Sequence, residues 1–148
     1  MLDLAPARLM HRCALLHEDR ASTAVTDDIA LVRSAFAAES ARGALETHAA
    51  CILPNGLYFV LGTREDDDIC LRLTRLSASL RAHSAGAIRL VAPAHARIPE
   101  GGLAAACRAC EAMPVTWSLC ERPEDWPYSS LHRRAVKAAV TTTERATG

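Results

Sequence analysis

A hairpin signal in the middle of the chain constrains the fold more than any other feature. Thr47–Leu53 and Leu57–Gly62 are two apolar runs of strand length, and Pro54-Asn55-Gly56 separates them. An Asn-Gly pair between two such runs is a strong signal for a tight turn. The sequence therefore predicts two antiparallel strands, and the turn gives Gly56 a structural reason to be glycine.

The segments on either side of the hairpin have the patterns of further strands and helices. Strands are expected over Arg8–Leu16 and Ile88–Ala92, and Pro93–Pro99, which contains His95, is expected to be a loop. Capping residues and helical spacing predict helices over about Asp28–Arg42 (N-cap Thr26 or Asp27, stop at Gly43), about Asp67–His83, about Leu103–Met113 (ended by Pro114) and Leu131–Val140.

This β-α-β-β-α-β-α order predicts an α+β fold of the ferredoxin-like type, an antiparallel sheet with helices packed on one face. A chain of 148 residues is long enough for one domain with a core of its own. We assign residues 1–140 to that single domain. Residues 141–148 have no apolar face and are expected to be a disordered tail.

The charge of the chain argues against strong nucleic-acid binding. The formal net charge is zero and the pI is about 7.0, whereas Lys and Arg supply most of the affinity for phosphates. Acid gathers at Glu65–Asp68, and base gathers near the end of the chain. The basic residues there are His132, Arg133, Arg134 and Lys137. A neutral total therefore still permits a basic face.

Nothing in the sequence indicates a membrane or secreted protein. No apolar run approaches the roughly 20 residues that span a bilayer. Met1–Met10 lacks the continuous apolar segment of a signal peptide. We expect a cytoplasmic location and no membrane partner.

The six cysteines do not form a recognisable metal set. Cys107-Arg-Ala-Cys110 has the spacing of half a zinc site, but no second Cys or His pair with metal spacing accompanies it. Leu103, Cys107 and Cys110 fall at i, i+4 and i+7 of the expected helix, which are positions of its buried stripe. The pattern favours core cysteines. The acidic run Glu65–Asp68 needs no cation either, because the helix dipole stabilises carboxylates at a helix N-terminus.

The segment Pro114–Ser130 carries the most specific motif of the chain. It reads Pro-Val-Thr-Trp-Ser-Leu-Cys-Glu-Arg-Pro-Glu-Asp-Trp-Pro-Tyr-Ser-Ser, with Trp126 and Tyr128 in polar, proline-punctuated surroundings. This run resembles the end of the REP-associated tyrosine transposases, small DNA-nicking enzymes whose chains often close with Pro-Val…Leu-Val-Glu-Arg-Pro-Glu-Asp-Trp-Pro-Trp-Ser-Ser. The resemblance extends over roughly Leu9–Arg134 and implies the same ferredoxin-like architecture.

The same resemblance implies that the nicking chemistry has been lost. The family carries Met-Pro-Asn-His-hydrophobic-His on a strand pair, and its two histidines hold a divalent metal such as Mg²⁺ or Mn²⁺ that polarises the scissile phosphate. Gly56 and Tyr58 stand at those positions here. The family's nucleophilic tyrosine lies on a later helix, and the matching helix places Leu80 there. The resemblance thus implies no catalytic residue and no metal cofactor in this chain.

One interpretation is a catalytically inactive transposase-like domain that retains weak binding to hairpin or single-stranded DNA, with a homodimer left open. Aromatic stacking and basic contacts would carry such binding. The candidate contacts are Arg122, Trp126, Tyr128, His132, Arg133 and Arg134. For the two aromatic residues the structural alternative is favoured, in which they anchor the C-terminal segment to the sheet.

Two other interpretations compete with DNA binding. A protein-interaction or regulatory module of the same fold, without DNA binding, would suit the neutral net charge. A new active site would require His48 and His83 to meet Tyr58, which is the least favoured reading because a lone histidine is more often an ordinary core or surface residue.

Overall fold

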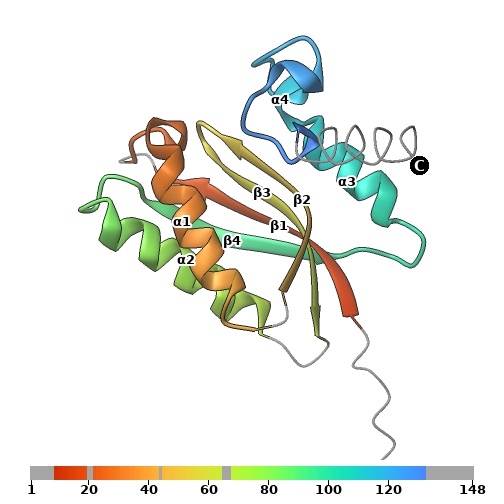
Figure 1. Ribbon diagram of the computed structural model, residues 1–148, viewed down its shortest axis with the longest axis horizontal. Coiled ribbons are helices and arrows are strands. Elements are labelled where there is room, and N and C mark those ends of the chain that lie inside the picture. The colour runs from red at the N-terminus through yellow and green to blue at the C-terminus, as the bar shows by residue number, and fades with distance from the viewer. Residues whose placement is uncertain (1–8, 20–21, 44, 65–67, 133–148) are drawn as a thin grey trace, which may run out of the picture.

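The computed structural model describes residues 9–19, 22–43, 45–64 and 68–132, and a four-stranded antiparallel sheet runs through them (Figure 1). β1 (Leu9–Glu18) and β3 (Gly56–Arg64) form the centre of the sheet. β2 (Leu45–Leu53) and β4 (Leu90–Arg97) form the edges, in the order β2-β3-β1-β4. The predicted hairpin is the β2–β3 pair, and the α+β, ferredoxin-like fold class is confirmed.

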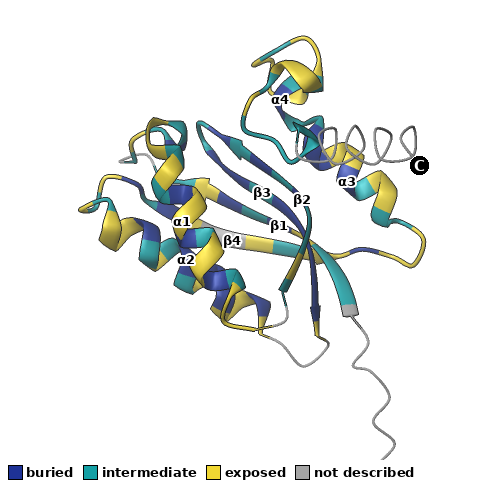
Figure 2. Ribbon diagram, in the orientation of Figure 1, coloured by how far each residue is buried: buried dark blue, intermediate teal, exposed yellow. Residues whose placement is uncertain are grey.

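Two long helices, α1 (Ile29–Ser40) and α2 (Ile69–His83), cover one face of the sheet, which we call the helix-covered face (Figure 1). Apolar residues of both helices pack there against every second residue of the central strands. Figure 2 shows that α1 and α2 each combine buried and exposed positions along their length. The buried members are Ala14, Leu16, Val25, Val32, Ala35, Leu57, Phe59, Leu61, Ile69, Leu73, Leu76, Leu80, Ile88 and Leu90.

The start of α1 differs from the expectation. Val25–Asp28 forms a short 3-10 helix ahead of α1, so the N-cap is Asp28 and not Thr26 or Asp27. The Asp28 carboxylate accepts a hydrogen bond from the backbone N–H of Leu31 at 3.2 Å.

α3 (Leu103–Glu111) lies against the opposite face of the sheet, which we call the groove face. Cys107 and Cys110 are buried there against Cys51 of β2 and Val60 of β3, so the prediction of core cysteines is confirmed. The expected packing of helices on one face is correct for α1 and α2, and α3 adds a layer on the other face.

Pro114 does not simply stop the cysteine helix. α3 already ends at Glu111, and Pro114 lies in the first turn of a further short helix, α4 (Met113–Thr116). Proline is tolerated in a first turn because the N–H that it lacks would have no intrahelical partner there. None of the described helices is long and apolar enough to cross a membrane.

The predicted loop over Pro93–Pro99 is wrong for most of its length. Residues 93–97 belong to β4, which is longer than the predicted strand and contains His95. β4 pairs only with β1 and has a register irregularity between its Val91 and Ala94 partners. A proline is compatible with an edge strand and with a bulge because it need not donate to a ladder there.

The segment after α4 returns to the free edge of β2. Ser129 forms an isolated antiparallel bridge with Cys51, and the backbone N–H of Ile52 donates to the Tyr128 carbonyl at 2.9 Å. The segment therefore covers an edge that would otherwise expose unpaired backbone groups. Beyond residue 132, the predicted helix over 131–140 and the tail over 141–148 lie outside the described residues.

Candidate functional site

Gly56 is held against the neighbouring strand by its backbone. A Cβ atom at this position would lie 2.4 Å from the carbonyl oxygen of Leu16 and 3.1 Å from the Cα of His17. Both contacts are with backbone, which cannot turn away as a flexible side chain can. The glycine is therefore required by the close approach of β1, and an imidazole at this position would force the two strands apart.

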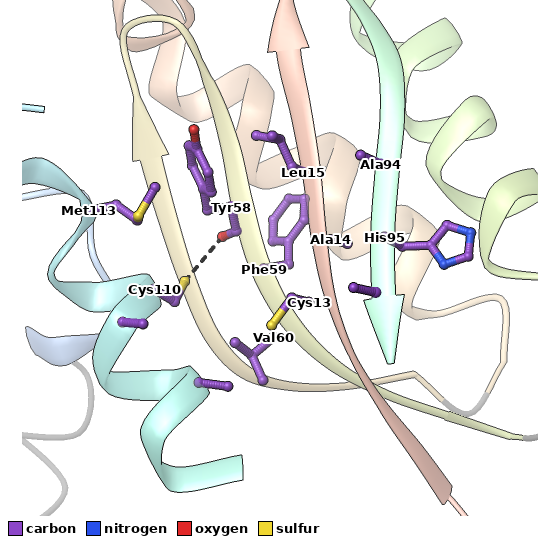
Figure 3. A pocket seen from close by; sticks show the side chains of 13 residues that line it. Cys13, Ala14, Leu15, Tyr58, Phe59, Val60, Ala94, His95, Cys110 and Met113 are labelled. Carbon is purple, nitrogen blue, oxygen red and sulfur yellow. Dashed lines mark hydrogen bonds between the residues drawn. The ribbon is translucent and has the colours of Figure 1, made fainter. Parts of the chain in front are cut away.

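Tyr58 projects from β3 onto the groove face, where it contacts the cluster beneath α3 (Figure 3). Burial raises the pKa of its phenol, a hydrogen bond from the Trp117 indole lowers it in part, and Cys51 adds a small upward effect. The backbone carbonyl of Tyr58 accepts a hydrogen bond from the Cys110 thiol at 3.5 Å. A phenol that keeps its proton at neutral pH is a poor metal ligand.

Leu80 does not share a site with Gly56 and Tyr58. Its side chain is fully buried in the core between α2 and the helix-covered face, whereas Tyr58 lies on the groove face. Leu80 and Tyr58 therefore lie on opposite sides of the sheet. The helix opposite Tyr58 is α3, and its residues nearest the groove are Ala106, Ala109 and Cys110.

An apolar groove of about 360 Å³ separates α3 from the β1–β4 half of the groove face (Figure 3). Its side chains come from β1, β3, β4 and the α3–α4 region. They include Cys13, Leu15, Tyr58, Val60, Cys110 and Met113. Figure 3 shows that the His95 ring points away from the groove. The groove thus offers thiols, a thioether and one phenol, and its lining residues include no carboxylate.

The candidate DNA contacts form an anchored segment. The indole N–H of Trp126 donates to the Ile52 carbonyl at 2.9 Å, and its ring lies edge-on to that of Tyr128 with 5.8 Å between centroids. The His132 ring bonds to the Trp126 carbonyl. This geometry holds Trp126 against the β2 edge.

Of the arginines proposed as DNA contacts in the same region, Arg122 is paired with carboxylates and the others lie outside the described residues. Arg122 Nε lies 3.7 Å from a Glu124 oxygen and 3.6 Å from an Asp125 oxygen, so acidic neighbours offset its charge. Arg133 and Arg134 lie outside the described residues.

Trp117 is the aromatic residue that the sequence reasoning missed. Its side chain is 49% exposed and hydrogen-bonds to Tyr58 at the groove. The exposed Leu119 follows two residues later. The sequence around Pro114 did not predict the exposure of Trp117. That exposure follows from the short α4, at whose C-terminal end Trp117 lies.

The histidine and tyrosine residues of a new active site are not brought together. His48 packs edge-on against His11 beside Gly62, four residues along β3 from Tyr58. His83 bonds to the Ser79 carbonyl at the exposed end of α2. Among the residues that the structure describes, no group of three His, Cys, Asp or Glu side chains is placed to hold a metal ion.

Comparison with known proteins identifies the fold. No protein-family profile and no curated protein matches the chain. The structure is similar to that of a REP-associated tyrosine transposase bound to a REP hairpin, with a TM-score of 0.76 and 17% sequence identity over 93% of this chain and 87% of that one. It is also similar to a protein of Deinococcus radiodurans R1 provisionally assigned as a transposase, with a TM-score of 0.50 and 14% identity over 75% of this chain and 96% of that one. The chain therefore has a transposase-like fold.

Proposed function

We propose that this chain is a transposase-fold domain that does not nick DNA and binds hairpin or single-stranded DNA weakly through backbone phosphates. One observation carries the loss of nicking. Two strand positions correspond to the metal-holding histidines of the resembled family: Gly56, which has no side chain and no room for one against Leu16, and Tyr58, which lines an apolar groove.

The packing around that strand supports the same conclusion. Gly56 cannot gain a ligand without displacing the backbone of Leu16. The groove presents Cys13, Cys110 and Met113, whereas Mg²⁺ and Mn²⁺ prefer oxygen ligands. Of the α3 residues that face it, Ala106 and Ala109 have no nucleophilic group.

DNA binding is supported by the shared fold and by the exposed cations. The similar transposase was solved with a REP hairpin. Several arginines of the described surface have no carboxylate partner among the described residues. These are Arg12, Arg33, Arg81, Arg97 and Arg108. Guanidinium groups bind phosphate oxygens in bidentate geometry, which suits a backbone contact without sequence readout.

The alternative is a protein-interaction module, and the apolar lining of the groove supports it. Cys13, Ala94 and Ala96 are exposed on an apolar sheet face that α3 leaves uncovered. Such a surface would bind a partner in a way that depends little on salt.

A salt series discriminates between the two functions. Fluorescence anisotropy with labelled hairpin, single-stranded and duplex DNA is expected to give dissociation constants of about 1–100 µM that weaken linearly in log–log plots against salt concentration. No detectable binding at about 50 mM salt would favour the protein-interaction module.

The loss of nicking is tested separately. We expect labelled hairpin DNA to remain uncut with Mg²⁺ or Mn²⁺, because the residues that the structure describes include no cluster placed to hold a metal ion and α3 carries no tyrosine. A covalent protein–DNA adduct on a denaturing gel would overturn this part of the proposal, and a Tyr58→Phe variant would then show whether Tyr58 is the attacking group.

A further inference from the structure

Two arginines face each other across the β1–β4 pair. Arg12 and Arg97 are direct partners in the register, so their side chains leave the sheet on the same face. Cβ atoms of such partners lie about 4.5–5.5 Å apart, and like charges directly opposite each other destabilise a sheet. Among the described residues no carboxylate pairs with either guanidinium. The arrangement costs stability, and no described carboxylate offsets the two charges.

One of the two guanidinium groups is held in place. Arg12 Nη1 lies 3.2 Å from His95 Nδ1, and His95 Nε2 lies 3.1 Å from the Cys70 thiol in the first turn of α2. A guanidinium can only donate, so Nδ1 is the accepting nitrogen and the proton of the neutral ring lies on Nε2, facing the sulfur. The chain Cys70–His95–Arg12 therefore fixes the orientation of Arg12, while Arg97 is exposed and free to close on a ligand.

Among the described residues, the carboxylate nearest in sequence to Cys70 already accepts a hydrogen bond. Asp68 caps α2 by accepting from the backbone N–H of Leu71 at 3.1 Å. It is thereby directed at the helix terminus, two residues before Cys70.

We infer that the Arg12–Arg97 pair is a binding site for the phosphates of a DNA backbone. Two guanidiniums on one face present parallel donor forks to phosphate oxygens, and a bound phosphate would offset the repulsion between them. This inference rests on the proposed DNA binding and deepens it by naming the contact surface, which is the β1–β4 edge and not the C-terminal segment.

The test compares two double variants of equal charge change. Arg12→Gln/Arg97→Gln removes the pair, and Arg33→Gln/Arg81→Gln removes two exposed arginines from α1 and α2. Anisotropy with a labelled DNA hairpin, measured between 50 and 300 mM salt, is expected to show a loss of affinity of about tenfold or more and a salt slope reduced by about 1–2 for the first variant. The control variant is expected to lose no more than about threefold.

Each other outcome overturns the inference in a distinguishable way. Equal losses in both variants would mean that net charge alone acts, so the site would be refuted while DNA binding stands. Wild-type protein without measurable DNA affinity would refute both proposals. Thermal melting adds a readout that is independent of DNA: relief of like-charge repulsion is expected to leave the Tm of Arg12→Gln/Arg97→Gln unchanged or slightly higher. A Tm lowered by several degrees would show that the arginines support the fold.

Discussion

The two faces of the sheet differ in how completely they are covered. On the helix-covered face, two long helices bury a continuous apolar core that includes Leu16, Phe59 and Leu80. On the groove face, the nine-residue α3 covers β2 and part of β3 and leaves the β1–β4 half as an open groove. Stability is therefore concentrated on one face, and side chains on the other can change with less effect on folding.

This difference means that side chains on the groove face can change while the fold is kept. Tyr58 lies at the groove, where many side chains would fit, and its replacement alters few core contacts. Gly56 is the exception because its backbone is wedged against Leu16, a residue of the other core. A glycine there stabilises the close approach of β3 and β1 independently of any chemistry.

The largest expected effect contrasts one leucine from each face. Leu80→Ala should lower the free energy of unfolding by about 2–5 kcal/mol, because it empties a fully buried site in the core. Leu15→Ala, on the partly exposed groove face of β1, should cost less than about half as much. Urea unfolding followed by circular dichroism measures both. Equal losses would mean that the groove is closed in solution and that the two faces do not differ.

The second contrast uses the two tryptophans. Trp126→Ala should cost about 2–3 kcal/mol, since it removes a half-buried ring and its hydrogen bond to the Ile52 carbonyl. Trp117→Ala should cost about 1 kcal/mol or less because that ring is largely solvated. Thermal and urea melting provide the comparison. If Trp126→Ala melted like wild type and lost DNA affinity tenfold, Trp126 would be a stacking platform and not an anchor.

Local patterns predicted the parts of the fold that are decided locally. The Pro54-Asn55-Gly56 turn and the spacing of Ile69, Leu73, Leu76 and Leu80 depend on nearby residues, and the structure has both the hairpin and the buried helix face. Even so, none of the positive backbone φ angles falls at Asn55 or Gly56, so the reason for Gly56 is the tertiary contact with Leu16.

Features that depend on distant partners could not be predicted in this way. β4 extends through His95 because β1 supplies a partner from the other end of the chain. Glu39 is buried because Arg75 of α2 lies 3.2 Å away, although a lone glutamate on α1 indicates a solvated position. Which side of the sheet Leu80 occupies relative to Tyr58 likewise depends on the assembled sheet and not on either segment alone.

The smallest expected effect is a pH dependence of stability, and it tests how far α3 covers the groove face. Cys51 on β2 lies fully buried beneath α3, and burial, with a smaller contribution from Cys120, raises the pKa of its thiol from 9.0 to about 12. Cys13 on β1 points to the same face but is exposed, and partial burial raises the pKa of its thiol. The two thiols thus mark the covered and the open halves of one surface.

Between pH 9 and about 12 the unfolded Cys51 thiol has lost its proton while the folded one retains it. The unfolded state then binds fewer protons, so this contribution to stability is fully present below pH 9 and is lost as the pH rises toward 12. From pH 8 to pH 10 wild-type protein should lose about 1 kcal/mol more than Cys51→Ala, measured by urea unfolding at each pH. Cys13→Ala should retain most of the wild-type pH dependence, because its thiol is already near water. A wild-type pH dependence matched by Cys51→Ala would mean that water reaches β2 beneath α3, and the groove would then extend across the whole face.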